Sequence, residues 1–452
     1  DSMRKMMSTV HNKNGKIIQY TKGACEILLE RSTHYLDENG QIVPMTNDIK
    51  ENIKSKNKEF ADNALRVLGA AYREYENVPE DFEAESLEKD LTFIGFVGMI
   101  DPCRPEVYDA IKNCKKAGIR PIMITGDHID TATAIGKDLK IIKDSSEAIT
   151  GAELDNLSEK ELIRVINKCS VFARVQPEHK TKIVKALKSQ ELVVAMTGDG
   201  VNDAPSIKAA DIGISMGITG TDVTKGASDM VLADDNFATI VNAVEEGRKI
   251  YDNIRKVLQF QLSTNTAEVI YVFLASILGV TVVTPAQLLW INMVTDSTPG
   301  LALGMEKAEG DLMKRKPRSS KESVFSDGAG SSMIIHGVIM AFIVVLSFFI
   351  GQYIELGRYG VFESVDGMTM SFLTANLIEI FYAICMRTQK GSIFKMNTRN
   401  KWLAGSFILS LVFTAGVIYI PALSNMFGLA QISLKEFLIA FGLAFMIIPF
   451  TE

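Results

Sequence analysis

Long apolar stretches in the second half of the chain constrain its fold more than any other feature of the sequence. Of the 452 residues, 47% are hydrophobic, which is high for a wholly soluble protein. After Asp235, several apolar stretches are each long enough to cross a bilayer as a helix. There are six of them, at about 257–280, 285–304, 332–355, 368–387, 402–422 and 434–450. We therefore expect residues 236–452 to form a stalk and an all-α bundle of six transmembrane helices.

The charges of the connecting loops predict how this bundle is oriented, because Lys and Arg accumulate on the cytoplasmic side of membranes. Basic residues cluster before the first stretch, after the second and after the fourth, at Arg248, Lys249, Arg255, Lys256, Lys314, Arg315, Lys316, Arg318, Arg387, Lys390, Lys395, Arg399 and Lys401. The intervening loops are short or mildly acidic. Both chain ends are thus expected in the cytosol. Helices buried in a soluble protein would show this alternation only by chance.

The net charge and the cysteines limit which partners the protein could bind and in which cellular compartment its soluble part could lie. The net charge is -6 without long runs of one sign, which argues against nucleic acid as a partner. The five cysteines have no CxxC spacing, and an odd number suits reduced thiols better than a disulfide framework. We expect the soluble part to face the cytosol. Because the chain starts at Asp1 and has no signal-like segment, the sequence also suggests an internal cut there.

Up to about Ala233 the sequence is typical of a soluble protein with both helices and strands. Helical stretches such as 160–167 alternate with short apolar runs at 92–100, 121–125 and 192–197. This alternation predicts βαβ units around a parallel sheet.

A polar segment follows one of the predicted strands. The run Leu192–Met196 ends in Thr197-Gly198-Asp199-Gly200-Val201-Asn202-Asp203, which places two carboxylates after the strand. Ligands bind at this edge of open α/β sheets, and the glycines allow a sharp turn. Carboxylates with a phosphate group are suitable ligands for Mg²⁺. The alternative is a polar turn that caps the next helix.

Two further motifs favour phosphate chemistry. Thr125-Gly126-Asp127 follows the apolar run Ile119–Ile124 and offers a hydroxyl and backbone N–H groups at an equivalent edge. Arg174-Val175-Gln176-Pro177-Glu178-His179-Lys180 places a cation at the start of an amphipathic helix, where it could stabilise a phosphoryl group in transfer. Considered alone, Lys180 would be a solvated surface lysine.

Together these motifs resemble the phosphorylation domain of P-type ATPases of the calcium-pump and sodium-pump class, within the haloacid dehalogenase superfamily. Asp101-Pro102-Cys103-Arg104 matches the same family, although Cys103 replaces its usual second proline. The resemblance implies a Rossmann-like α/β phosphorylation domain over residues 101–235. It further implies that Asp199 holds Mg²⁺ with support from Asn202 and Asp203. Thr125 and Lys180 would hold the phosphoryl group, next to Gly126 and Asp127.

Residues 1–100 resemble the C-terminal part of the α+β nucleotide-binding domain of the same family. Thr21-Lys22-Gly23-Ala24 is similar to the lysine motif near the adenine. The resemblance implies nucleotide contacts from a dispersed set of residues, namely Lys5, Lys22, Gly23, Arg66 and Arg174. The sequence has no Walker A glycine loop, so ATP recognition would depend on this set.

Polar residues within the apolar stretches share helix faces. Asn265 and Glu268 are three apart, Asn292, Thr295 and Asp296 follow i, i+3, i+4 spacing, and Asn376 and Glu379 repeat the first spacing. Such carboxylates are costly in a bilayer and are functional by default, whereas Asn376 also fits interhelical hydrogen bonding. Pro285, Pro299 and Gly300 are expected to help unwind the second stretch.

An all-oxygen set of carboxylates, amides and a hydroxyl is what Ca²⁺ prefers. The stretches 289–296 and 263–268 resemble the fifth and sixth transmembrane helices of sarcoplasmic-reticulum-type calcium pumps, and Glu379 resembles the acid of the eighth. The resemblance therefore implies a transported-cation site for Ca²⁺, with protons entering when the ion is absent. The family's glutamate on the fourth helix falls outside the chain.

Two motifs of that family, DKTGT with its aspartate nucleophile and TGES, do not occur in the chain. We therefore expect the nucleophile on a missing N-terminal portion of the pump, and no covalent intermediate on this polypeptide alone. The sequence leaves open a pump for Na⁺, H⁺ or another cation, and a non-catalytic half-protein that binds cations or regulates a partner. The expected location is a multi-pass position in a lipid bilayer, with the cell membrane favoured.

Overall fold

The computed structural model describes residues 5–62, 65–79, 81–99, 102–319, 321–326, 328–389, 391–396 and 398–452. The chain divides into two compact units, Asp1–Val241 and Asn242–Glu452. This division falls inside the long helix α11 (Phe237–Leu278), so that helix belongs to both units. The finer division of the first unit at residue 100 stays a prediction.

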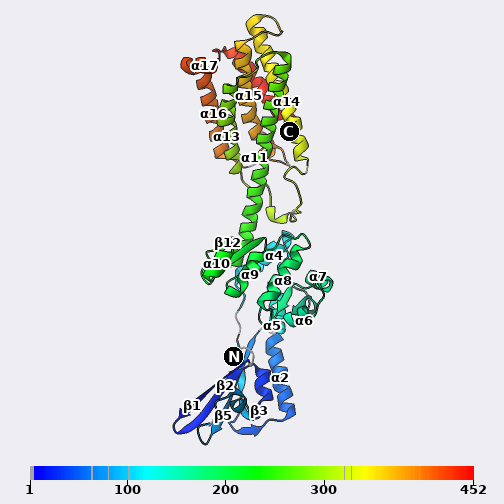
Figure 1. Ribbon diagram of the computed structural model, residues 1–452, viewed down its shortest axis with the longest axis vertical. Coiled ribbons are helices and arrows are strands. Elements are labelled where there is room, and N and C mark those ends of the chain that lie inside the picture. Colours follow the sequence, from blue (N-terminus) through cyan, green and yellow to red (C-terminus); the bar gives the residue numbers. More distant parts are fainter. Residues whose placement is uncertain are drawn as a thin grey trace. The chain divides into compact units, whose positions relative to one another are not determined.

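The first unit begins with a mixed six-stranded sheet in the order β1-β2-β5-β6-β3-β4. Its strands are β1 (Met6–Lys13), β2 (Lys16–Gly23), β3 (Ser32–Leu36), β4 (Ile42–Pro44), β5 (Arg66–Tyr75) and β6 (Leu91–Met99), with helices α1 (Cys25–Glu30), α2 (Asn47–Asp62) and α3 (Ala84–Leu87). All pairs are antiparallel except β3 with β6. The long strands β1, β2 and β5 lie side by side (Figure 1). Leu28, Leu29 and Leu91 are fully buried in the core of this part.

Two parallel three-stranded sheets follow, in the orders β7-β9-β8 and β10-β11-β12. Their strands are β7 (Met123–Ile124), β8 (Ala148–Thr150), β9 (Val171–Ala173), β10 (Ala195–Gly198), β11 (Ile212–Met216) and β12 (Met230–Leu232). The helices between them are α4 (Pro105–Lys116), α5 (Ile129–Asp138), α6 (Gly151–Asp155), α7 (Glu159–Lys168), α8 (Pro177–Lys188), α9 (Ala204–Ala209) and α10 (Asp222–Ala227). The parallel pairing agrees with the expected βαβ pattern.

Capping and burial explain where individual helices and strands begin. Helix α7 covers the predicted helical stretch and starts with a capping box in which Ser158 and Glu161 satisfy each other's backbone N–H groups. Strand β6 matches the run predicted at 92–100 to within a residue. In contrast, the run predicted at 192–197 forms a strand only from Ala195, because Leu192 and Val193 are 49% and 64% exposed. An apolar run is therefore not always a buried strand.

The second unit is helical. Among the described residues, four segments are long and apolar enough to cross a membrane, namely Ala329–Leu356, Val365–Cys385, Lys401–Tyr419 and Leu434–Thr451. They correspond to α14, α15, α16 and the pair α18 (Leu434–Phe445) and α19 (Ile447–Thr451), with α17 (Pro421–Phe427) preceding that pair. These agree with the last four predicted stretches, and helices α14, α15 and α16 are visible in Figure 1. The chain is an integral membrane protein.

The first two predicted stretches are less regular. One is the second half of α11, where the polar run Ser263–Thr266 and Glu268 lower the apolar character. The other breaks into α12 (Pro285–Trp290), a π-helix at Ile291–Asp296 and α13 (Ser297–Gly304). Pro285 occupies the first turn of α12 and breaks no hydrogen bond there. The expected unwinding is therefore replaced by a wider helical turn.

Helix α15 forms the centre of this unit, since 89% of its most apolar 18-residue segment is buried. Polar side chains on this helix bond across to its neighbours. Thr374 pairs with Ser347 of α14 at 2.7 Å, and the Tyr382 hydroxyl donates to Ser263 of α11 at 2.8 Å. Such interhelical bonds help to hold helices together where the lipid offers no polar partner. The bundle therefore places α11 and the π-helix segment against a polar face of α15.

Candidate functional sites

Both glycine-containing loops lie at carboxyl ends of parallel strands. Thr125-Gly126-Asp127 follows β7, and Thr197–Asp203 begins at the end of β10. Side chains from the two three-stranded sheets pack together. Ile124 of β7 contacts the hydrophobic cluster that contains Met196 of β10. Val194, just before β10, contacts the cluster that contains Phe172 of β9. Because Ile124 and Val194 each contribute to both clusters, the two strand ends belong to one packed body.

Asp203 is the organising residue of the second loop. Asp203 is 6% exposed, and its Oδ1 lies 2.5 Å from the ammonium group of Lys180. Its Oδ2 accepts hydrogen bonds from the backbone N–H groups of Asp199 and Gly200 at 3.3 and 3.2 Å. A Cβ atom on Gly198 would approach Asp203 to 2.4 Å, so only glycine fits there. The loop is thus shaped around a carboxylate that is already paired.

Asp199 and Asn202 extend outward from this loop, and both side chains are exposed. An exposed carboxylate beside an anchored Lys180–Asp203 pair fits Mg²⁺, which takes one or two carboxylates and completes its shell with waters and phosphate oxygens. In the described part of the chain, no cluster of three or more His, Cys, Asp or Glu side chains could hold a metal ion by itself. A phosphate group would therefore have to supply the remaining ligands.

The first loop is held by its own hydroxyl group. The Thr125 hydroxyl donates to the Asp127 carboxylate at 3.0 Å and accepts from the Asp127 backbone N–H at 3.1 Å. Arg174 joins the same edge, since its backbone N–H donates to the Asp127 carbonyl at 3.0 Å. A Cβ on Gly126 would meet nothing within 4 Å, which leaves open space over the backbone there. Thr125, Asp127 and Arg174 are therefore brought together as one group.

The residues predicted to contact a nucleotide lie in the first sheet, apart from Arg174. Lys22 and Gly23 end β2, and Met6 pairs with Gly23 in the adjacent strand. The Lys5 carbonyl accepts from the Ala24 N–H at 3.0 Å, and a Cβ on Gly23 would lie 2.5 Å from that carbonyl oxygen. Only glycine at position 23 therefore allows the Lys5 carbonyl to lie so close to β2. The side chain of Arg66, which begins β5, lies outside the described residues.

In the membrane unit, three acidic side chains come from three different segments. Glu268 of α11 accepts hydrogen bonds from the Asn292 amide at 3.0 and 3.1 Å. Asp296 is 4% exposed and lies 3.4 Å from the Thr264 hydroxyl, while Glu379 of α15 is 3% exposed. Asn292 and Asp296 lie one turn apart in the π-helix segment, and α15 packs against that segment. The sequence places the three acids far apart, and the fold brings them into one neighbourhood.

Two oxygens in this neighbourhood are buried without a hydrogen-bond partner, namely Asp296 Oδ1 and Glu379 Oε2. An orphaned buried carboxylate oxygen is costly unless something else binds it. Thr295 is fully buried beside Asp296 in the π-helix, a type of turn that occurs frequently at functional sites. Because the three acids do not form a metal-holding cluster by themselves, a hard cation bound here would also need the amide and hydroxyl oxygens.

Not every predicted ligand joins this group. Asn265 is exposed, although Glu268 one turn later is half-buried. Asn376 is fully buried, where its amide donates to the Phe372 carbonyl at 2.6 Å and its oxygen accepts from Thr414 at 3.3 Å. Asn376 therefore fits the alternative of interhelical hydrogen bonding.

Sequence reasoning missed Thr264, which faces Asp296. Its position four residues before Glu268, on the same helix face, could have identified it.

Two family models match the chain. One is described as "Cation transporting ATPase, C-terminus" and matches residues 280–452. The other is described as "P-type ATPase, cytoplasmic domain N" and matches residues 1–106. Their ranges flank the parallel sheets and cover the first sheet and most of the membrane unit.

Similar proteins extend the match to nearly the whole chain. Calcium-transporting ATPase 1 of Bacillus cereus is 46% identical over 99% of this chain and 51% of its own length. The calcium-transporting ATPase of Bacillus subtilis is 43% identical over 98% of this chain and 49% of its own length. Calcium-transporting ATPase 3, endoplasmic reticulum-type, of Arabidopsis thaliana is 36% identical over 99% and 48%. The chain spans about half the length of these relatives, and it belongs to the P-type cation-transporting ATPases.

Proposed function

We propose that the protein containing this chain is an ATP-driven pump that exports Ca²⁺ from the cytosol. The observation that carries the proposal is the group of Glu268, Asp296 and Glu379, in which two buried carboxylate oxygens have no hydrogen-bond partner. Carboxylates from three helical segments with an amide and hydroxyls form the oxygen-rich set that Ca²⁺ prefers. The similar proteins named calcium-transporting ATPases support the same ion.

In the proposed cycle, an aspartate on a segment outside these residues attacks the γ-phosphorus of ATP, and ADP leaves. Thr125 and Lys180 hold the phosphoryl oxygens, with Gly126 and Asp127 next to them. Asp199 would hold Mg²⁺ with support from Asn202 and Asp203, and the charge of that ion would offset the negative charge of the phosphate groups. Lys180 is kept in position by its ion pair with Asp203, at 2.5 Å. The chain's own residues therefore bind and orient the phosphoryl group.

The two three-stranded sheets are proposed to be parts of one haloacid-dehalogenase-like sheet. Strands β7 and β10 are edge strands, each has a Thr-Gly-Asp sequence at its carboxyl end, and their side chains share core clusters. A parallel strand that carries the nucleophile could pair with either edge. Lys5, Lys22, Gly23, Arg66 and Arg174 are proposed to bind the ATP that this nucleophile attacks.

For the membrane part, we propose six spans, with the second half of α11 and the α12–α13 segment added to the four long apolar helices. The polar side chains that make these two segments less apolar include Glu268, Asn292 and Asp296, so their irregularity follows from the cation site. Helix α11 begins close to the phosphorylation site in sequence and continues to Glu268. Such a helix could couple the two sites, with protons replacing Ca²⁺ when the cation has left.

The ion-dependent formation of the phosphoenzyme tests the proposal. The full-length pump, supplied with ATP, should become phosphorylated only when Ca²⁺ is present, and Asp296→Asn should require much more Ca²⁺. Na⁺ or H⁺ should not replace Ca²⁺ in this assay. Phosphorylation that responds to Na⁺ and ignores Ca²⁺ would favour the monovalent pump. A full-length protein that never becomes phosphorylated would favour a non-catalytic role.

A further inference from the structure

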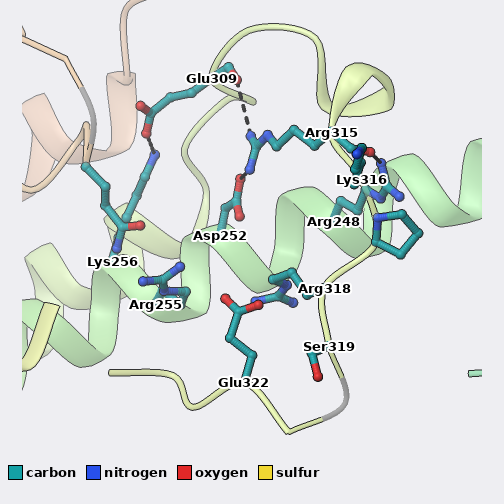
Figure 2. Close-up of a pocket in the computed structure, with 12 residues that line it drawn as sticks. Arg248, Asp252, Arg255, Lys256, Glu309, Arg315, Lys316, Arg318, Ser319 and Glu322 are labelled. Carbon is teal, nitrogen blue, oxygen red and sulfur yellow. Dashed lines mark hydrogen bonds and ion pairs between the residues drawn. The ribbon is translucent and has the colours of Figure 1, made fainter. Parts of the chain in front are cut away.

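A basic cavity lies in the second unit, close to the first residues of the apolar part of α11. Its volume is about 520 Å³. The walls come from α11, from the loop between α13 and α14, and from the loop after α15 (Figure 2). The lining residues are Arg248, Asp252, Arg255, Lys256, Glu309, Arg315, Lys316, Pro317, Arg318, Ser319, Glu322 and Gln389. The proposed pump cycle uses none of them.

The cavity carries an excess of positive charge. Its lining contains six Lys or Arg side chains against three Asp or Glu side chains. Two of the acids are already paired, Glu309 with Lys256 at 2.5 Å and Asp252 with Arg315 at 2.7 Å. The pKa of Arg248 is lowered first by burial and then by the positive charges of Arg315 and Arg318. Like charges are thus held close together, and an anion between them would relieve their repulsion.

Two of the basic side chains, those of Arg248 and Arg318, are held by other groups of the protein. The Arg248 guanidinium donates to the carbonyls of Leu312 and Arg315 at 2.8 and 2.9 Å. Arg318 lies over the ring of Tyr251, with its Cζ atom 3.1 Å from the centroid. Arg guanidinium groups are suited to phosphate because they form forked hydrogen bonds with its oxygens. A pre-ordered basic cavity loses less entropy when it captures such an anion.

The position of the cavity indicates where that phosphate could come from. Lys256 immediately precedes the apolar half of α11, and Arg248 lies about two helical turns earlier. This region therefore corresponds to the level of lipid headgroups on the cytoplasmic side. Anionic headgroups there attract basic residues by about 1 kcal/mol for each Lys or Arg. Lys316 and Arg318 are exposed and can meet a headgroup from outside.

We propose that this basic cavity binds a phosphate group, supplied by the headgroup of an anionic phospholipid or by a soluble phosphate compound. The inference concerns lipid or anion binding and does not depend on which cation is transported. Lys316 and Arg318 would contact the phosphate first, while Arg248 and Arg255 line the deeper part. A bound phosphate would connect α11 to the loop between α13 and α14.

Native mass spectrometry of the full-length pump in mild detergent tests the proposal. Phosphatidic acid, phosphatidylcholine and inorganic phosphate are the three probes. We expect phosphatidic acid to remain bound more often than phosphatidylcholine. Changing both Lys316→Gln and Arg318→Gln should weaken this retention by a factor of about thirty, as the loss of two basic contacts predicts. Arg318→Lys alone should retain most of the binding, because it keeps the charge.

A matched control removes the same charge elsewhere. Lys314 is exposed and does not line the cavity, and Lys395 lies on another cytoplasmic loop, so Lys314→Gln with Lys395→Gln should leave retention unchanged. If inorganic phosphate displaces the lipid, the site takes a soluble phosphate as well. Equal retention of phosphatidic acid by the wild type and the Lys316/Arg318 variant overturns the proposal, provided that both show the same thermal midpoint.

Discussion

At the scale of single residues, the two glycine-containing loops use glycine for different reasons. Gly198 is a packing requirement, since an added Cβ would lie 2.4 Å from the Cβ of Asp203. At Gly126 an added Cβ would meet nothing within 4 Å, so a methyl group there would project into open space. This open space lies where the proposal places the phosphoryl group. The same residue type thus has a structural role in one loop and a ligand-access role in the other.

This difference predicts opposite phenotypes for two alanine variants of the full-length pump. Gly198→Ala should lower stability by about 1–3 kcal/mol, because Asp203 has to move and its buried ion pair is disturbed. Gly126→Ala should leave stability nearly unchanged and should slow phosphoenzyme formation. Thermal unfolding and phosphorylation with labelled ATP measure the two effects. A Gly198→Ala protein as stable as the wild type would contradict the packing argument.

Another residue-scale feature is the ion pair between Glu306 and Arg387. Glu306 is 1% exposed, and Arg387 donates to it at 3.0 and 3.2 Å while Asn400 donates at 3.0 Å. Burial alone would raise the pKa of Glu306, but these hydrogen bonds outweigh it and hold that pKa below its ordinary value. A depressed pKa in the folded state means that the pair stabilises the protein above the unfolded pKa. This stabilisation is lost as the pH falls through the folded value.

Arg387→Gln should therefore destabilise the full-length protein by about 3–5 kcal/mol at neutral pH, because it leaves a buried carboxylate without its cation. Glu306→Gln should remove the part of the acid destabilisation that arises from this pair. Thermal midpoints measured from neutral pH down to below the ordinary pKa of a glutamate side chain give both results. Lys395→Gln is the control, since this exposed lysine lies on the same loop as Arg387 but outside the pair. If Glu306→Gln has the same acid profile as the wild type, the pair does not carry the effect.

At the scale of elements, Asp235 connects the loop after β11 with the start of α11. Its carboxylate accepts from the backbone N–H groups of Gly217, Ile218 and Thr219 at 2.6, 3.0 and 2.8 Å, and from the Thr219 hydroxyl at 2.8 Å. The hydrogen bonds from Ile218, Thr219 and Gly217 lower the pKa of Asp235 to about 2. The loop is therefore held by an ionised carboxylate two residues before α11.

Asp235→Ala should release this loop. We expect faster amide hydrogen exchange at Gly217, Ile218 and Thr219 in the full-length protein, because their common acceptor is gone. In the wild type the same exchange should rise only as the pH falls toward about 2, where Asp235 becomes protonated. Asp211→Asn is the matched control. The Asp211 carboxylate accepts from the backbone N–H of Val194 at 2.9 Å, which lies outside the loop 217–219. Unchanged exchange at residues 217–219 in Asp235→Ala would contradict this role.

The elements also show how far sequence reasoning reaches. The positions of Thr125–Asp127 and Thr197–Asp203 after strands could be predicted, because short apolar runs end in glycine-containing turns there. Capped helices such as α7 could be predicted for the same local reasons. The pair of Asp203 with Lys180 and the contact of Thr264 with Asp296 could not, since they join residues far apart in sequence. The π-helix is not predicted either, since Pro285, Pro299 and Gly300 indicate an unwound segment there.

At the scale of the whole molecule, the proposed function requires the membrane acids to act as one site. Glu268, Asp296 and Glu379 come from α11, the π-helix and α15, and Asp296 and Glu379 each have a buried oxygen without a hydrogen-bond partner. Three unpaired acids would be hard to retain at this depth, since each charge costs at least about 2.5–3.5 kcal/mol in the bilayer centre. A shared divalent cation would remove this cost. The three residues should therefore depend on one another.

This dependence predicts how the variants Glu268→Gln, Asp296→Asn and Glu379→Gln combine. Each should raise the Ca²⁺ concentration for half-maximal phosphorylation of the full-length pump by about tenfold or more, since each removes a charged ligand. Double variants should show less than the product of the single effects, because the first change already damages the site. Ser347→Ala, which removes a buried hydroxyl paired with Thr374 at 2.7 Å, controls for general loosening of the bundle. If Asp296→Asn keeps the wild-type Ca²⁺ dependence, or if the single effects multiply fully, the three carboxylates do not form one cation site.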